Sequence, residues 1–186
     1  MFRRTPVALA AVAALGAAVL VSGPADAKTK HKPHPKPNRI ETRGGEQVKI
    51  NGYIKDAESF FPGTLNVKSG ATVTLVNKSK GGAPHSLSLL KPSALPRTAN
   101  AIEQCVACGP LIAAHQANPD TGEVGVPLYD TGAPGFETMG DNTTAGDSIF
   151  LPPKGKVKFK VTAKKGTTLS FFCAIHPWMQ GKIKVK

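Results

Sequence analysis

The sequence has few acidic residues, few aromatic residues and only three cysteines. Twelve aspartates and glutamates stand against 24 lysines and arginines, so the 186-residue chain carries a formal net charge of +12. Such a charge favours acidic partner proteins and a weak association with anionic envelope surfaces. We expect no binding to nucleic acid, because the lysines are spread over predicted strands without aromatic residues between them.

The chain has a single long apolar segment, and it lies close to the N-terminus. Residues 7–21 are rich in alanine, valine and leucine, follow Arg3 and Arg4, and precede a small-x-small cleavage pattern at residues 25–27. The run is short for a membrane span, and a polar, proline-rich segment follows it. We therefore predict a signal peptide at residues 1–27 and an exported protein, located in the periplasm, the extracellular space or the cell envelope.

A basic, proline-rich segment follows the cleavage pattern. Residues 28–38 read KTKHKPHPKPN and contain no apolar residue that folding would bury. We predict an extended linker over residues 28–45 and a folded domain over residues 46–186. His31 and His34 are able to capture a metal, but a solvated tail is the simpler interpretation.

Most of the predicted domain consists of short segments typical of β-strands, separated by turns rich in glycine, asparagine and lysine. The predicted strands are residues 48–54, 64–67, 71–76, 85–90, 149–151, 157–161, 168–173 and 182–185. Seven or eight short strands at this spacing favour an all-β fold, a β-sandwich with Greek-key connections.

Residues 91–147 depart from the strand pattern. Residues 94–117 are compatible with helix, although Pro96 and the Gly-Pro pair at residues 109–110 break the segment into pieces. The remainder, up to residue 147, is loop-like. Because a structureless loop of this length is unusual in a compact domain, we predict a partly helical insertion with a functional role.

Two of the three cysteines, Cys105 and Cys108, form a Cys-x-x-Cys pair inside this insertion. In an exported protein we expect them to form a disulfide, which leaves Cys173 as the odd thiol available to a metal. His115 follows one to two helical turns later, so a second metal site made by Cys105, Cys108 and His115 stays an alternative. A thioredoxin-type redox pair lacks the surrounding βαβ pattern.

The strongest chemical signal lies near the C-terminus, where Cys173, His176 and Met179 fall within one short loop. Cys173 ends the predicted strand at residues 168–173, on the face expected to point into the sandwich. His85 begins another predicted strand and is able to complete the group. Two imidazoles and a thiolate with a weak axial thioether form the ligand set of a blue-copper electron-transfer site.

At these residues the chain resembles the cupredoxins, the blue type 1 copper proteins of the plastocyanin, pseudoazurin and amicyanin group. Three stretches carry the resemblance: residues 61–73 (FPGTLNVKSGATV), residues 77–86, which end in Pro84-His85-Ser86, and residues 172–183 (FCAIHPWMQGKI). The spacing Cys-x-x-His-x-x-Met is similar to the short spacing of amicyanin. The resemblance covers roughly residues 46–90 and 148–186, and the insertion lies outside it.

The resemblance implies a cupredoxin-like sandwich that holds one type 1 copper ion and performs no catalysis. It implies that the copper ligands are His85, Cys173, His176 and Met179. Gln180, or a backbone carbonyl near residues 83–84, is a competitor for the axial position. Ser86 stands where many relatives carry asparagine, and we expect its hydroxyl to bond across to the Cys173 loop.

These observations predict a monomeric carrier that passes single electrons between redox partner proteins, some of them acidic. Trp178 either lines the port beside His176 through which electrons pass or packs under the loop. An alternative is a copper-binding protein for storage or delivery in the cell envelope, which the tail histidines, the Cys-x-x-Cys pair and Met139 motivate. A third class, an accessory subunit of a copper-dependent enzyme, has no support in the sequence itself.

Overall fold

The computed structural model describes residues 36–118, 121 and 123–186 of the chain. The predicted signal peptide and the part of the predicted linker that contains His31 and His34 lie outside the described residues. Within the described residues, no helix is both long enough and apolar enough to cross a membrane.

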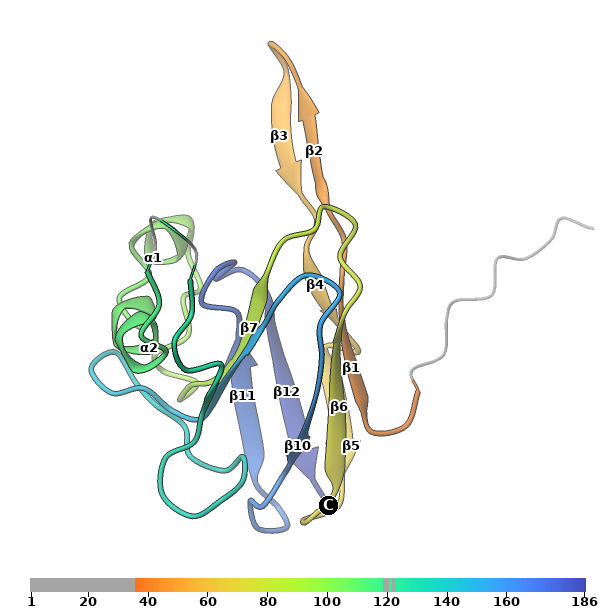
Figure 1. Ribbon diagram of the computed structural model, residues 1–186, viewed down its shortest axis with the longest axis vertical. Helices are drawn as coiled ribbons and strands as arrows, with labels where there is room; N and C mark the ends of the chain where they lie inside the picture. The colour runs from red at the N-terminus through yellow and green to blue at the C-terminus, as the bar shows by residue number, and fades with distance from the viewer. Residues whose placement is uncertain (1–35, 119–120, 122) are drawn as a thin grey trace, which may run out of the picture. The chain divides into compact units, whose positions relative to one another are not determined.

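Twelve strands and two short helices are found in the described part of the chain (Figure 1). The strands are β1 (Arg39–Arg43), β2 (Glu46–Lys49), β3 (Tyr53–Asp56), β4 (Ser59–Phe61), β5 (Thr64–Val67), β6 (Thr72–Asn77), β7 (His85–Leu89), β8 (Leu128–Tyr129), β9 (Ser148–Leu151), β10 (Lys156–Lys160), β11 (Thr168–Phe172) and β12 (Gln180–Val185). The helices are α1 (Ala99–Gln104) and α2 (Cys108–Ala114).

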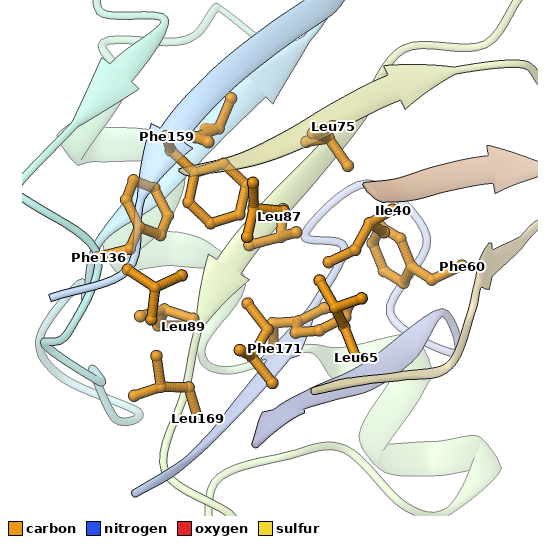
Figure 2. Packing of buried hydrophobic residues seen from close by; sticks show 14 of the residues in the cluster. Ile40, Phe60, Leu65, Leu75, Leu87, Leu89, Phe136, Phe159, Leu169 and Phe171 are labelled. Carbon is orange, nitrogen blue, oxygen red and sulfur yellow. The ribbon is translucent and has the colours of Figure 1, made fainter. Parts of the chain in front are cut away.

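The strands form a β-sandwich, as the sequence predicts. A four-stranded sheet has the order β10-β6-β1-β4, and a six-stranded sheet has the order β5-β12-β11-β7-β9-β8. Side chains from both sheets meet in one hydrophobic cluster (Figure 2). Phe60 of β4 and Phe171 of β11 pack edge to face across it, with ring centroids 4.9 Å apart. Alternation along each strand therefore buries one face of each sheet against the other.

The predicted single strand over residues 48–54 is wrong, because the chain turns back on itself within it. β2 and β3 form an antiparallel hairpin in which Val48 lies opposite Ile54. The turn contains Asn51 with a φ of 57°, a left-handed conformation that asparagine tolerates better than most residues. The Asn-Gly pair at residues 51–52 was the local signal for this hairpin.

The sandwich begins within the predicted linker, before Glu46, where the sequence analysis places the start of the folded domain. β1 pairs in parallel with β6 and antiparallel with β4, and Ile40 is fully buried. Three of its five residues are charged, so the sequence pattern does not indicate a buried strand. Glu41 is only 5% exposed, and it is paired with the arginines at both ends of β1 at 2.6 Å and 2.7 Å. Because the buried carboxylate is paired with these cations, the strand fits inside the sheet.

The insertion packs on the face of the six-stranded sheet that points away from the main core. Phe172 of β11 alternates with Phe171 and joins a second hydrophobic cluster with Leu90, Leu95 and Leu111. The two short helices and this cluster confirm the expectation of a partly helical insertion. β11 is thus buried on both faces. Cys173, the residue that follows it, is fully buried and belongs to the main core cluster, on the face away from the insertion.

Candidate metal centre

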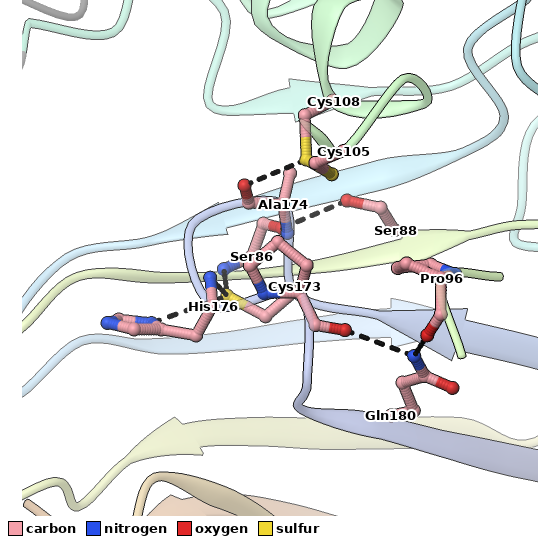
Figure 3. The surroundings of a disulfide bond; sticks show 10 residues. Ser86, Ser88, Pro96, Cys105, Cys108, Cys173, Ala174, His176 and Gln180 are labelled. Carbon is pink, nitrogen blue, oxygen red and sulfur yellow. Dashed lines mark hydrogen bonds between the residues drawn. A yellow bond between two sulfur atoms is a disulfide. The ribbon is translucent and has the colours of Figure 1, made fainter. Parts of the chain in front are cut away.

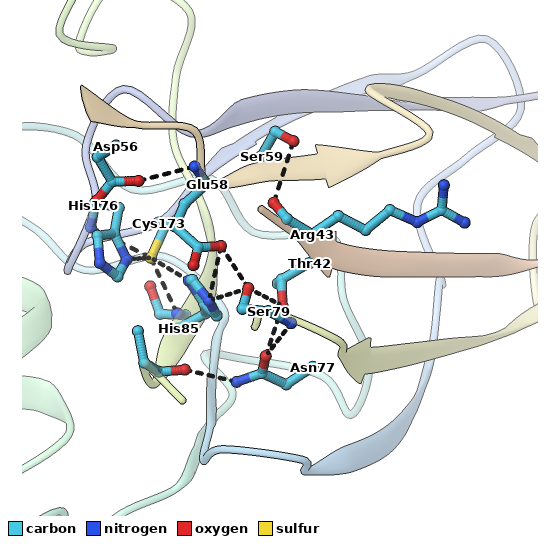
Figure 4. A network of polar contacts seen from close by, with 12 residues as sticks. Thr42, Arg43, Asp56, Glu58, Ser59, Asn77, Ser79, His85, Cys173 and His176 are labelled. Carbon is cyan, nitrogen blue, oxygen red and sulfur yellow. Dashed lines mark hydrogen bonds and ion pairs between the residues drawn. The ribbon is translucent and has the colours of Figure 1, made fainter. Parts of the chain in front are cut away.

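His85, Cys173 and His176 come together at one end of the sandwich. His85 is the first residue of β7, Cys173 directly follows β11, and His176 lies in the loop that leads to β12. The Sγ of Cys173 lies 3.9 Å from Nδ1 of His85 and 3.7 Å from Nδ1 of His176 (Figure 4). The ligand atoms of all three residues lie within 4.8 Å of one another. Both imidazoles therefore present the same ring nitrogen to the sulfur.

The three side chains are shielded from solvent to different degrees. His85 and Cys173 are fully buried, whereas His176 is partly exposed. Burial and, to a lesser extent, the nearby His176 lower the pKa of His85 to about 4. Burial also lowers the pKa of His176. Both rings are therefore neutral near pH 7, the form in which imidazole binds a metal.

Burial raises the pKa of the Cys173 thiol, because a thiolate loses its hydration there. Hydrogen bonds to the sulfur, including those from the Ser86 and His176 amides, oppose this effect. The Ser86 amide donates to Cys173 Sγ at 3.2 Å, and the His176 amide donates to it at 3.4 Å. A cation that replaces the thiol proton would complete the stabilisation of the sulfur charge.

Ser86 bridges to the cysteine loop in two ways. Its backbone amide donates a hydrogen bond to the Cys173 sulfur. Its Oγ also accepts a hydrogen bond of 2.8 Å from the backbone amide of Ala174, the residue after Cys173. This contact confirms the expected bond from the Ser86 hydroxyl to the Cys173 loop. The start of β7 and the end of β11 are therefore tied together at the site.

The far nitrogen of His85 is held by two residues that the sequence analysis did not single out. Its Nε2 lies 2.8 Å from Ser79 Oγ and 3.6 Å from a carboxylate oxygen of Glu58, and the Ser79 hydroxyl also bonds to Glu58 (Figure 4). Glu58 is only 5% exposed. These contacts fix the orientation of the ring, so that Nδ1 faces Cys173. No local sequence signal marks Glu58, because it reaches the histidine from the segment between β3 and β4.

Asn77 holds the turn that leads into His85. Its Nδ2 donates to the carbonyl of Ala83 at 2.8 Å and to the carbonyl of Pro152 at 3.1 Å. Its Oδ1 accepts from the Thr42 hydroxyl at 2.9 Å. Because these partners come from three separate segments, the position of His85 depends on the packing of the whole sandwich end.

Met179 is buried in the main core cluster, at the end of the loop that carries Cys173 and His176. Its backbone amide donates to the carbonyl of His176 at 2.8 Å, and its carbonyl accepts from the amide of Cys173 at 3.0 Å. The competing residue Gln180 is used elsewhere. Its Nε2 donates to the carbonyls of Pro96 and Pro177 (Figure 3).

Cys105 and Cys108 form a disulfide, as predicted, with their Cα atoms 5.3 Å apart. The Sγ of Cys108 lies 3.1 Å from the carbonyl oxygen of Ala174 (Figure 3). A disulfide sulfur carries no hydrogen, so this is a close sulfur–oxygen contact and not a hydrogen bond. The insertion therefore touches the loop immediately beside Cys173.

The alternative of a second metal site at this cysteine pair is wrong for this structure. Both sulfurs are in the disulfide, and both ring nitrogens of His115 contact other groups: Nδ1 lies 2.5 Å from the Val126 carbonyl and Nε2 lies 2.7 Å from Ser148 Oγ. Over residues 36–118, 121 and 123–186, the only cluster of metal-ligating histidine, cysteine and acidic side chains is His85, Cys173 and His176.

Apolar side chains border the exposed edge of His176. The ring of Trp178 contacts the imidazole at a centroid distance of 5.3 Å and an angle of 70°. Trp178 is 41% exposed and Ile175 is 40% exposed. The indole therefore lies at the surface beside His176, which favours the interpretation that it lines a port.

The converging atoms suit one metal ion. Metal bonds to nitrogen and sulfur of about 2.0 to 2.3 Å span donor atoms that are 3.7 to 3.9 Å apart. A thiolate with two imidazoles is a donor set that favours copper. The β-sandwich brings His85 of β7 together with Cys173 and His176 of the Cys-x-x-His-x-x-Met loop. This is the fold and the His-Cys-His group that the resemblance to the cupredoxins implies.

Three solved cupredoxins show the degree of likeness. They are a purple cupredoxin from Nitrosopumilus maritimus (16% identity, TM-score 0.40, covering 80% of this chain and 98% of that chain), an auracyanin from Roseiflexus castenholzii (18%, 0.40, 82% and 99%) and auracyanin A from Chloroflexus aurantiacus (21%, 0.41, 81% and 100%). No protein-family model and no curated protein matches the sequence. The likeness of this chain to the cupredoxins lies in its strands and its donor atoms.

Proposed function

We propose that the protein is an exported, monomeric blue-copper carrier that passes single electrons between redox partners. In this proposal one type 1 copper ion is held by His85, Cys173, His176 and Met179. The observation that carries the proposal is the convergence of the Cys173 sulfur with two imidazole Nδ1 atoms, at a buried position where only the His176 ring is partly exposed. Bound copper would supply a reversible one-electron couple.

The contribution of the chain is to hold the ligands in place while the charge at the site changes. His85 is fixed through Ser79 and Glu58, and the sulfur of Cys173 accepts two backbone hydrogen bonds. Backbone bonds on both sides of Met179 tighten the loop. A site that moves little between oxidation states transfers electrons with a small reorganisation cost.

Met179 is proposed as the axial ligand because it is buried at the site end and follows His176 in a tightly hydrogen-bonded loop. Gln180 is the weaker candidate, since its side-chain nitrogen already donates to two carbonyls. A thioether is a weak, soft donor, which suits the long axial bond of a blue-copper site.

Electrons would enter and leave through the exposed edge of His176. Trp178 and Ile175 form an apolar rim around it, which allows a partner protein to approach closely without having to strip water from charged groups. The formal charge of +12 supports acidic partners and a weak association with anionic envelope polymers. We propose no catalytic role.

The test is to add Cu(II) to the purified protein and record its visible and electron paramagnetic resonance spectra. An intense visible band with narrow copper hyperfine splitting, at one copper per chain, is the expected result. A colourless protein with ordinary copper splitting would refute the assignment of the four ligands.

Copper storage or delivery is the weaker alternative in this structure. Cys105 and Cys108 are oxidised and offer no thiolate, and Met139 packs against the main core. Binding of several Cu(I) ions per chain without an intense visible band would favour this alternative over electron transfer.

A further inference from the structure

Four buried polar side chains form an unbroken hydrogen-bonded chain from the Cys173 loop into the insertion. Ser86 Oγ lies 3.0 Å from Ser88 Oγ, Ser88 Oγ lies 2.7 Å from Ser148 Oγ, and Ser148 Oγ lies 2.7 Å from Nε2 of His115. Figure 3 shows its first links, from Ala174 through Ser86 to Ser88. Each of the four side chains belongs to a residue at most 4% exposed. We call Ser86, Ser88, Ser148 and His115 the serine–histidine chain.

At the His115 end of the serine–histidine chain, the direction of hydrogen-bond donation is fixed. Nδ1 of His115 lies 2.5 Å from the backbone carbonyl of Val126, and a carbonyl oxygen only accepts hydrogen bonds. Nδ1 therefore carries the proton. Burial lowers the pKa of His115, so the ring is neutral near pH 7 and its Nε2 is an acceptor.

The same direction of donation holds at each serine, because each hydroxyl has only one hydrogen to donate. Ser148 donates its hydrogen to His115 and must accept from Ser88. Ser88 in turn must accept from Ser86. The single hydrogen of the Ser86 hydroxyl therefore points towards Ser88 and away from the metal site, and its lone pairs receive the amide of Ala174.

We propose that His115 is a positioning residue for the metal site, which acts through Ser148 and Ser88 to fix the orientation of the Ser86 hydroxyl beside Cys173. The inference rests on the proposed function insofar as copper is the group whose properties it changes. His115 contacts none of the candidate ligands in the contacts described. The tautomer of His115 sets the direction of the hydrogen bonds along Ser148, Ser88 and Ser86, and these three hydroxyl groups connect the insertion to the surroundings of the sulfur.

The Ser86 hydroxyl lies next to Cys173 in the structure. The Ser86 amide donates to the Cys173 sulfur at 3.2 Å, and Ser86 Oγ accepts from the amide of Ala174, the residue that follows Cys173. When Ser88 accepts its hydrogen, the Ser86 hydroxyl donates nothing to the sulfur. When that acceptor is removed, the hydroxyl is free to turn and donate to the thiolate. A donor to the thiolate stabilises its negative charge, which favours the reduced state of a bound copper ion.

The first test needs no variant and no metal. Nitrogen NMR of the full-length protein reports which ring nitrogen of His115 carries the proton. The expected spectrum shows protonated Nδ1 and an unprotonated, hydrogen-bonded Nε2. A proton on Nε2 would overturn the proposal, because the direction of the whole chain would then be reversed.

The second test breaks the chain inside the sheet. Ser88→Ala removes the acceptor of the Ser86 hydrogen, and Ser148→Ala frees the Ser88 hydrogen to donate back to Ser86 Oγ. Each variant therefore releases the Ser86 hydroxyl and is expected to shift the reduction potential upward and to change the amide proton shift of Ala174. Ser170→Ala is the matched control, because Ser170 is 1% exposed in the same sheet and its hydroxyl has no hydrogen-bond partner. The control is expected to leave both values unchanged.

A merely structural role would give a different pattern. It would lower the melting temperature of Ser88→Ala and Ser148→Ala while their potentials and Ala174 shifts stay equal to those of Ser170→Ala. That outcome overturns the proposal. If no blue-copper site forms, the proposed function fails, but the His115 tautomer and the Ala174 shift of the metal-free protein still decide this inference.

Discussion

The backbone amide of Ser86 donates a hydrogen bond of 3.2 Å to the sulfur of Cys173, across 87 residues of sequence. Ser86 directly follows His85, so this bond joins the segment that carries one candidate ligand to the side chain of another. The site is therefore built across the junction of β7 and the end of β11, and its geometry depends on how these strands pair.

Replacing the sulfur tests the ligand assignment directly. Cys173→Ser is expected to abolish the intense visible band on addition of Cu(II), because the band arises from charge transfer between thiolate and copper. The Cys105→Ser/Cys108→Ser double variant is the control and is expected to keep the band. The opposite pattern, with the band lost only in the double variant, would place the copper in the insertion.

Removing the support of His85 should weaken copper binding without removing a ligand. Ser79→Ala deletes the hydroxyl that lies 2.8 Å from Nε2 of His85. We expect a loss of copper affinity of about 10- to 100-fold, as is typical when a group that orients a metal-binding histidine is removed. The affinity is measured by competition with a chelator. Ser59→Ala, an exposed serine on β4, is the control, and an equal affinity in both variants would contradict the role of Ser79.

Glu41 should make the stability of the domain depend on pH. Burial raises the pKa of Glu41, but hydrogen bonds from Arg43 and Arg39 and the charge of Lys78 lower it below its ordinary value overall. A lowered pKa in the folded state means that the ionised group stabilises the fold above its unfolded pKa of about 4.5. This stabilisation is lost as the pH falls through the folded pKa.

Glu41→Gln should therefore lower the free energy of unfolding by on the order of 1–3 kcal/mol at pH 7. The difference from the wild type should shrink below about pH 4.5. Urea unfolding of the copper-free protein at several pH values measures it, with the exposed Glu46→Gln as the control. A difference that stays constant down to pH 3 would rule out this ionisation effect.

Phe172 should anchor the insertion to the sheet. Its side chain is fully buried in the second cluster, on the opposite face of β11 from Phe171. Phe172→Ala is expected to cost about 3–5 kcal/mol of unfolding free energy, because it leaves a large cavity. Val106→Ala, at a position 61% exposed in the insertion, should cost little, and thermal unfolding of both variants provides the comparison. Similar melting temperatures would show that the insertion does not depend on this contact.

A charge placed beside His176 should slow electron exchange. Trp178→Lys is expected to reduce the rate of electron self-exchange by about tenfold or more, because two copies would meet with like charges at the port. The visible spectrum should stay unchanged, since Trp178 is outside the proposed ligand set. Val106→Lys adds the same charge at an exposed position in the insertion. If both variants exchange electrons at the same rate, the port lies elsewhere.

The strands that the sequence predicts well are those with clean alternation, such as β5 and β10. β1 escaped prediction because Glu41 looks incompatible with a buried strand until its two arginine partners are placed beside it. The hairpin of β2 and β3 escaped because alternation continues through Asn51 and hides the turn. In both cases a local pattern was overridden by a contact or a backbone conformation that alternation alone does not describe.

By itself, the sequence determined the short loop that carries Cys173, His176 and Met179, the odd thiol, and the alternation that buries the sulfur. These features depend on spacing along a few residues, which a linear chain displays directly. Only the tertiary structure decided that Glu58 and Ser79 hold His85, that Phe172 has a covered face, and that hydroxyl groups link Ser86 to His115. Those contacts join residues from separate strands and from the insertion, and their positions follow from how the two sheets and the insertion pack.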